Sequence, residues 1–231
     1  MVISIGGWET GPLNYHICYE SMEELKNNHL QNCKVLPTRV DLIKQMPQDS
    51  IGAELGIWDA EFSRVISKII KPQLFYLVDT WIDMDLEERL TDNFIKRSKN
   101  SSYIKRKETT ESFLNSLEDN YLDWVYVDAA HDYDSVKTDL LLSKDKVKDE
   151  GYIMGHDFIN YDYINQFDYG VKEAVHEFLH SFDYEMVYLT LDPDGYYSYC
   201  LKKSEKKAWL VLFYFVYSSM EMRDIKMKSN P

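Results

Sequence analysis

Short apolar runs alternate with segments of helical periodicity from residue 50 to residue 202, and this pattern restricts the chain to very few folds. Between the runs, apolar residues recur at helical spacing, as Phe62, Val65 and Ile69 do. Strands that alternate with helices pair into a mostly parallel sheet that is covered on both faces. The segments predicted as strands are residues 50–55, 74–78, 103–104, 124–127, 151–154, 182–189 and 196–201.

The last two predicted strands are separated only by a turn, Asp192-Pro193-Asp194-Gly195. Parallel neighbours need a crossover of about a dozen residues or more, so these two strands are expected to be antiparallel. The predicted fold class is therefore α/β, with a doubly wound, mostly parallel seven-stranded sheet and an antiparallel C-terminal hairpin at one edge. We expect residues 1–46 to be an N-terminal extension that packs on a main domain of residues 47–203, and residues 204–231 to be a C-terminal tail.

The balance of charge argues against one broad class of function. The 231 residues include 26 Lys and Arg against 39 Asp and Glu, a formal net charge of -13. Nucleic-acid phosphates require a basic surface, so no nucleic-acid partner is expected. The sparse cysteines Cys18, Cys33 and Cys200 form neither a disulfide framework nor a metal motif. Since the first residues also lack a signal-peptide pattern, the expected location is the cytoplasm.

The tail contains the longest apolar run, residues 208–217. A helix needs about 20 apolar residues to span a bilayer, so no stable membrane insertion is expected. The run could be an extra strand, a core helix, a dimer contact or a membrane-surface segment, because basic residues precede it. Packing or dimerisation is the favoured interpretation, and a homodimer could form through this run or through the N-terminal extension.

Unusual polar residues follow four of the predicted strands. In doubly wound sheets, ligands bind beyond the carboxyl ends of the strands. One aspartate after a strand is commonly a helix cap, but four acidic strand ends in succession favour a functional site. The strand ends read Glu54-Leu55-Gly56, Asp79-Thr80-Trp81, Asp128-Ala129-Ala130-His131 and His156-Asp157.

Asp79 lies 25 residues after Glu54, the spacing of the acidic residue that binds ribose hydroxyls in nucleotide-binding βαβ units. Gly56 permits close approach of the backbone to a ligand. The segment lacks the GxGxxG fingerprint, which counts against an NAD-binding protein, and the chain contains no phosphate-binding P-loop sequence.

Residues 50–202 resemble class I S-adenosylmethionine-dependent methyltransferases, in particular small-molecule O-methyltransferases. Two motifs carry this resemblance: the segment from Ala53 to Ser63, and Val127-Asp128-Ala129-Ala130-His131-Asp132-Tyr133 followed by the segment from Gly151 to Asp157. Residue 60 departs from the family, which usually has glycine where this chain has alanine. The resemblance implies a Rossmann-like fold and S-adenosylmethionine (SAM) as the cofactor.

The resemblance also implies a role for each strand end. Glu54 and Gly56 would line the methionine end of the cofactor, and Asp79, with Thr80 beside it, would hold the ribose. Trp81 would lie near the adenine, and a core tryptophan is an equal alternative. Asp128 would belong to both the cofactor site and the reacting centre.

Asp128 and Asp157 are also candidate metal ligands, because metal-dependent relatives hold a divalent cation with carboxylates at such positions. Carboxylate oxygens suit Mg²⁺, and His156 as a third ligand would shift the preference toward Mn²⁺. A bound cation lowers the pKa of an acceptor oxygen and orients it. The alternative is structural: Asp128 would cap the following helix and Asp157 would face solvent.

His131 is the candidate general base, since an imidazole is well matched to proton transfer near pH 7. It could instead have another role in the metal site, or be a hydrogen-bonded structural residue. The leading hypothesis is a SAM-dependent methyltransferase that methylates a small hydroxylated molecule, such as a sugar or natural product, with assistance from a divalent metal. The alternatives are a non-catalytic cofactor-binding protein on the same fold and an NAD-binding Rossmann protein.

Overall fold

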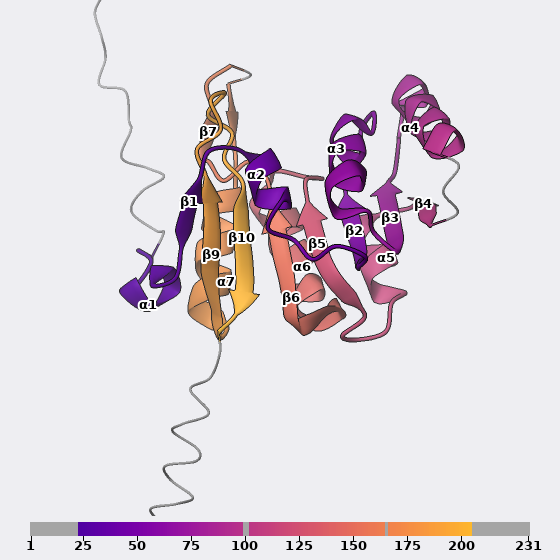
Figure 1. Ribbon diagram of the computed structural model, residues 1–231. Helices are drawn as coiled ribbons and strands as arrows, with labels where there is room; N and C mark the ends of the chain where they lie inside the picture. The colour runs from indigo at the N-terminus through magenta and orange to yellow at the C-terminus, as the bar shows by residue number, and fades with distance from the viewer. Residues whose placement is uncertain (1–22, 99–101, 165, 205–231) are drawn as a thin grey trace, which may run out of the picture.

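A single eight-stranded sheet organises the chain, in the order β1-β9-β10-β6-β5-β2-β3-β4. The computed structural model describes residues 23–98, 102–164 and 166–204 (Figure 1). All seven predicted strands are present, and the α/β doubly wound fold class is confirmed. The strands of the sheet are β1 (Lys34–Leu36), β2 (Ile51–Leu55), β3 (Leu74–Asp79), β4 (Tyr103–Lys107), β5 (Leu122–Val127), β6 (Val147–Gly155), β9 (Tyr184–Thr190) and β10 (Tyr199–Lys203).

The strand β10 alone runs against its neighbours in this sheet: it pairs antiparallel with both β6 and β9. The predicted hairpin of β9 and β10 is therefore present. It is followed at its outer side by β1, which pairs in parallel with β9 and was not predicted. Three residues are too few to show strand periodicity, so this eighth strand left no clear signal in the sequence.

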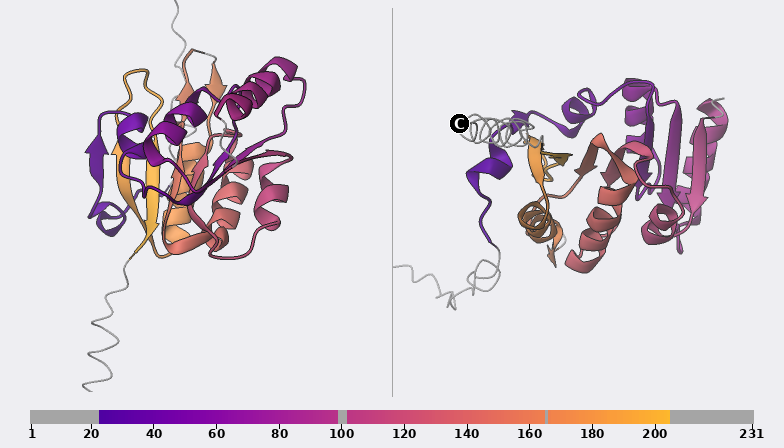
Figure 2. Two further views of the ribbon diagram at one scale, coloured as in Figure 1. Left: turned by 45° about the vertical axis from the view of Figure 1, so that its right-hand side comes forward. Right: turned by 90° about the horizontal axis from the view of Figure 1, so that it is seen from below.

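Helices cover both faces of the sheet (Figure 2). Helices α5, α6 and α7 pack on one face, whereas α2 and α3 pack on the other. The helices are α1 (Asn27–Leu30), α2 (Arg39–Ile43), α3 (Glu61–Ile70), α4 (Asp85–Ser98), α5 (Thr110–Asn115), α6 (Tyr133–Lys146) and α7 (Val171–Ser181).

Alternation along the strands divides the buried side chains between two cores. On β5, Val125 and Val127 join the cluster beneath α5, α6 and α7, while Trp124 and Tyr126 join the cluster beneath α2 and α3. Successive side chains of a strand point to opposite faces, so a strand covered on both sides is apolar at every position. This explains why the predicted strands read as continuous apolar runs.

A second, two-stranded sheet forms an arm between β6 and α7, beyond the carboxyl edge of the main sheet (Figure 1). Its strands are β7 (Tyr161–Asp162) and β8 (Phe167–Asp168). Tyr163 and Ile164 are 74% and 77% exposed on this arm. Such short strands could not be predicted from periodicity.

The backbone is bent sharply at the carboxyl edge of the sheet. Gly56 has φ +89°, and a Cβ atom there would lie 2.1 Å from the carbonyl oxygen of Asp128. Glycine is required at this position because the β2 and β5 loops touch. Ala60 also adopts a left-handed conformation, with φ +63°, which accounts for the glycine that the family usually has there.

No helix among the described residues is long and apolar enough to cross a membrane. The apolar run at residues 208–217 lies outside the described residues, as do residues 1–22 of the predicted N-terminal extension. The predicted division at residues 46 and 203 and the predicted homodimer remain predictions.

Candidate active site

Glu54 is buried at the end of β2, where only 1% of the residue is exposed. Its carboxyl oxygen Oε2 accepts a hydrogen bond of 2.5 Å from the Ser63 hydroxyl on α3. Burial is the main cause that raises the pKa of Glu54 to about 8, with nearby Asp128 and Asp79 adding to the rise. Glu54 is therefore largely protonated at neutral pH in the protein without ligand.

Asp79, at the end of β3, organises the neighbouring loop. Its Oδ2 atom accepts hydrogen bonds from the backbone N–H groups of Ile57 and Trp58, at 2.8 and 3.0 Å. Its Oδ1 atom accepts from the N–H of Trp81 at 2.9 Å. The side chain is only half-buried, as is that of Thr80. Each carboxylate oxygen has two lone-pair directions, and these three backbone bonds leave one of the four, on Oδ1, free to accept from a ribose hydroxyl.

Trp81 has a buried side chain that is only 1% exposed. Its indole N–H donates to the carbonyl oxygen of Trp58 at 2.9 Å. Of the two interpretations that the sequence left open, burial favours the core tryptophan. In this structure Trp81 supports the loop above it and presents no face to a ligand.

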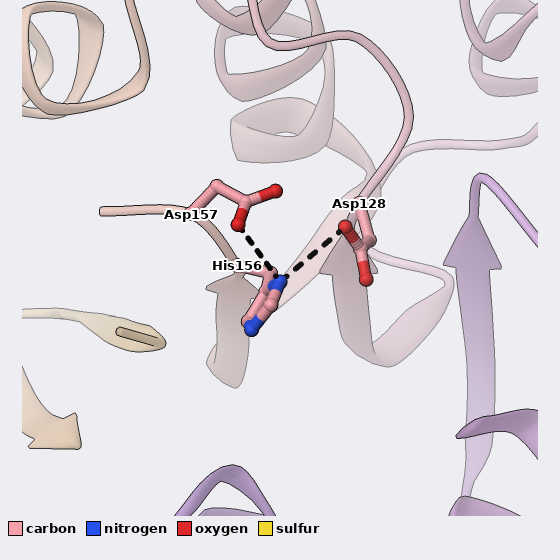
Figure 3. A group of neighbouring side chains, drawn as sticks. All are labelled: Asp128, His156 and Asp157. Atoms are coloured by element: carbon pink, nitrogen blue, oxygen red, sulfur yellow. Dashed lines mark ion pairs between the residues drawn. The ribbon is translucent and has the colours of Figure 1, made fainter. Parts of the chain in front are cut away.

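Asp128, His156 and Asp157 come together at the ends of β5 and β6 (Figure 3). The Nδ1 atom of His156 lies 3.7 Å from Asp128 Oδ1 and 3.2 Å from Asp157 Oδ1. One potential ligand atom from each of the three residues lies within 4.8 Å of the other two. The three predicted metal ligands are thus neighbours, because β5 and β6 are parallel and end side by side.

The two carboxylates of this cluster, Asp128 and Asp157, stabilise a positive charge placed between them. Burial acts to lower the pKa of His156, but Asp128 and Asp157 outweigh it and raise that pKa to about 10. An imidazolium therefore lies between the carboxylates at neutral pH when no other cation is bound. Asp157 also has a left-handed backbone, with φ +55°, a strained conformation of the kind that clusters at functional sites.

The structural alternatives for Asp128 and Asp157 find no support in the geometry. The N-cap of α6 is Asp132, whose side chain accepts a hydrogen bond from the N–H of Ser135. Asp157 is only 5% exposed, so it does not face solvent. Both aspartates point instead into the His156 cluster.

His131 lies next to the same cluster. Its Nδ1 atom is 3.1 Å from Asp157 Oδ2, so Asp157 contacts one histidine with each of its oxygens. The His131 ring packs on Tyr169 at 4.6 Å between ring centroids, and its side chain is 32% exposed. With Nδ1 directed at Asp157, the Nε2 atom is left to accept a proton. This geometry is suitable for a general base oriented by a carboxylate.

Sequence reasoning missed Arg39, the first residue of α2. A guanidinium nitrogen of Arg39 lies 3.8 Å from Asp128 Oδ2. It missed the contact between His131 and Tyr169 as well, because Tyr169 comes from the segment that follows the arm. Nothing in the local sequence distinguishes either residue. Their positions depend on segments that fold back over the carboxyl edge.

Replacing Glu54 by glutamine should make the stability of the protein less dependent on pH. The pKa of about 8 in the folded state lies above the ordinary value of 4.5, so the folded state binds this proton more tightly than the unfolded state. The resulting stabilisation is complete below about pH 4.5 and is lost as the pH rises through about 8. In urea denaturation from pH 5 to 8, the advantage of Glu54→Gln over wild type should grow by a few kcal/mol.

The matched control for this prediction is Glu173→Gln, at an exposed glutamate on α7. Its difference from wild type should stay constant over the same pH range. An equally constant difference for Glu54→Gln would show that the pKa of Glu54 is not raised.

Comparison with known proteins agrees with this geometry. Residues 53–158 match the family model of a methyltransferase domain. This segment runs from the β2 motif to the residue after Asp157. No curated protein sequence matches the chain.

Three solved structures illustrate the likeness in fold. A Clostridium thermocellum protein assigned as an rRNA methylase has a TM-score of 0.57 at 14% identity, covering 79% of this chain and 99% of its own. A SAM-dependent methyltransferase from Aquifex aeolicus has a TM-score of 0.54 at 12% identity, covering 71% of this chain and 87% of its own.

The third structure is a Streptococcus mutans protein assigned as a methyltransferase, in complex with S-adenosylhomocysteine (SAH). It has a TM-score of 0.54 at 10% identity and covers 71% of this chain and 95% of its own. The sheet order and the family match over the strand-end motifs lead to one conclusion: residues 53–158 form a methyltransferase domain, and the chain has the fold of SAM-dependent methyltransferases.

Proposed function

We propose that this protein transfers the methyl group of SAM to a hydroxyl oxygen of a small acceptor, with a divalent cation held by Asp128, His156 and Asp157. The observation that supports the proposal best is the clustering of these three residues next to His131. An oxygen acceptor must lose its proton on methylation. A cation site beside an oriented imidazole provides for that step better than a carboxylate pair alone would.

The donor set fits a divalent cation. Two carboxylates and one imidazole offer hard oxygen ligands and one nitrogen, a combination suited to Mn²⁺ or Mg²⁺. Ligand atoms lie about 2.1 Å from Mg²⁺, so adjacent ligands are about 3 Å apart and opposite ligands about 4.2 Å. The three ligand atoms lie within 4.8 Å of one another, so they would move closer together to hold a cation. When bound, the cation would act as a Lewis acid that favours the ionised acceptor.

The protein's own residues supply the remaining steps. Asp157 orients His131, whose Nε2 atom takes the acceptor proton. Gly56 and Asp79 hold the cofactor at the ends of β2 and β3, while the buried Glu54 is hydrogen-bonded to Ser63 on α3. The acceptor oxygen and the sulfonium methyl group are thereby placed in line. Such positioning contributes up to about 7–11 kcal/mol to catalysis in ideal cases.

A small acceptor is preferred to RNA on the grounds of charge. Two proteins of similar fold are assigned as rRNA methylases, but their identities of 14% and 12% indicate the fold and not the substrate. The net charge of -13 opposes approach to a polyanion. The release of SAH can be measured with an rRNA fragment and with hydroxylated small molecules as acceptors. If the protein methylates the rRNA fragment in preference to the small molecules, the acceptor is RNA and this choice is wrong.

Calorimetry should detect binding of SAM and SAH by the wild-type protein. Replacement of Asp79 by asparagine should weaken SAH binding by at least about tenfold, because a charge-assisted hydrogen bond to the ribose is lost. Asp59→Asn, in the same loop, is the control, and thermal melts should show that both variants fold. The role of Asp79 is wrong if Asp79→Asn binds SAH as wild type does. The proposed function is wrong if wild type binds neither ligand at millimolar concentration.

The metal site predicts that Mn²⁺ binds the apoprotein and that Asp157→Asn weakens this binding by more than about tenfold, since ligand charge sets the affinity for hard cations. Free Mn²⁺ can be followed by its electron paramagnetic resonance signal. Asp145→Asn, at an exposed position on α6, serves as the control and should bind like wild type. Equal affinity in wild type and Asp157→Asn would remove these residues from the metal site.

His131→Gln should lower kcat by about 10² or more once a screen for SAH release has identified an acceptor, because the general base is lost. The affinity for SAH should stay at the wild-type value, since His131 lies on the acceptor side of the cluster. An unchanged kcat would assign His131 a structural role. A parallel loss of Mn²⁺ binding would assign it to the metal site instead.

A further inference from the structure

The acidic edge of the sheet suits all but one of the charged groups of SAM. The cofactor carries a sulfonium cation, an ammonium group and two ribose hydroxyls, which complement carboxylates. Its α-carboxylate is an anion and is repelled by Glu54 in its ionised form, by Asp79 and by Asp128. A cofactor site in these surroundings therefore requires a cation placed for the carboxylate.

Arg39 is the one Lys or Arg within the described ranges whose ion pair involves any of the acidic strand ends Glu54, Asp79, Asp128 and Asp157. Figure 3 shows that one oxygen of Asp128 is directed at His156 and the other away from it. Arg39 contacts the second oxygen, Oδ2. Its positive charge also opposes the rise in the pKa of Glu54, so Arg39 is close enough to interact with the end of β2 as well as with Asp128.

Several contacts hold Arg39 in its position. Thr38 caps the short helix α2, and the backbone N–H of Arg39 donates to Asp192 Oδ1 at 2.8 Å. The guanidinium lies over the ring of Phe62, in the first turn of α3, at 4.2 Å from the ring centroid. These contacts fix the backbone and the ring-facing side of Arg39 without using its guanidinium N–H groups. The guanidinium also interacts with the Tyr126 hydroxyl, which still leaves several of its five N–H donors for other partners.

The guanidinium retains the capacity to bind a second anion. Its pair with Asp128 is long, at 3.8 Å, and 35% of the Arg39 side chain is exposed. A planar guanidinium matches a carboxylate with two parallel hydrogen bonds. A ligand carboxylate that arrives next to Phe62 would therefore find an oriented and incompletely paired partner.

We propose that Arg39 binds the α-carboxylate of the methionine part of SAM. This inference rests on the proposed use of SAM at the same site and extends it to the segment before β2, outside the matched methyltransferase domain. It makes α2 a part of the cofactor site. Arg39 would then distinguish SAM from ligands that lack the carboxylate.

Calorimetry with two ligands tests the proposal: SAM, and decarboxylated SAM, which keeps the sulfonium and ammonium groups but lacks the carboxylate. Wild type should bind SAM at least about tenfold more tightly than decarboxylated SAM. Arg39→Met keeps an apolar chain over Phe62 but removes the charge. It should lose most of this preference by weakening SAM binding, while its affinity for decarboxylated SAM stays close to that of wild type.

Arg39→Lys should recover part of the preference, since it restores the charge without the bidentate geometry. Arg97→Met, at an exposed arginine on α4, should behave as wild type does. Arg39→Met that retains the full preference for SAM would overturn the proposal. Failure of wild type to bind either ligand would instead contradict the proposed function, so the two failures are distinguishable.

Discussion

Four acidic side chains are concentrated at one edge of the sheet, and the local structure there is organised by the need to neutralise them. The strands β3, β2, β5 and β6 are parallel neighbours, so their carboxyl ends lie at the same edge of the sheet. This brings the side chains of Glu54, Asp79, Asp128 and Asp157 close together. Like charges at such separations repel strongly when they are shielded from water. The negative charge of each carboxyl group is therefore removed by protonation or balanced by hydrogen bonds or a nearby cation.

The way in which the charge is neutralised differs from strand to strand, and these differences correspond to the proposed roles of the residues. Glu54 is buried and largely protonated, with a hydrogen bond from Ser63. Asp79 accepts backbone N–H groups from the adjoining loops. Asp128 and Asp157 share the imidazolium of His156. The last arrangement is the one that a metal cation can replace, because a positive charge is already present between the two carboxylates.

The segment before β2 completes this edge and is more than a covering layer. The strand β1 extends the sheet, Leu42 and Ile43 are fully buried on α2, and Arg39 reaches Asp128. On the opposite side, the arm of β7 and β8 leads to Tyr169 beside His131. The proposed acceptor side of the site is therefore lined by loops whose sequences carry no general motif, which is why the sequence does not specify the acceptor.

The sequence by itself determined the strand and helix alternation, the C-terminal hairpin and the acidic strand ends, because each follows from short-range periodicity and from residues adjacent in the chain. Only the tertiary structure decided that Asp128, His156 and Asp157 form one cluster, that Trp81 is a core residue, and that Arg39, β1 and the arm belong to this edge. Those features depend on which strands are neighbours and on how distant segments pack over them. Such contacts join residues far apart in the chain. The strand-end motifs suggested the cluster of Asp128, His156 and Asp157, but no local pattern records the contacts of Arg39, β1 or the arm.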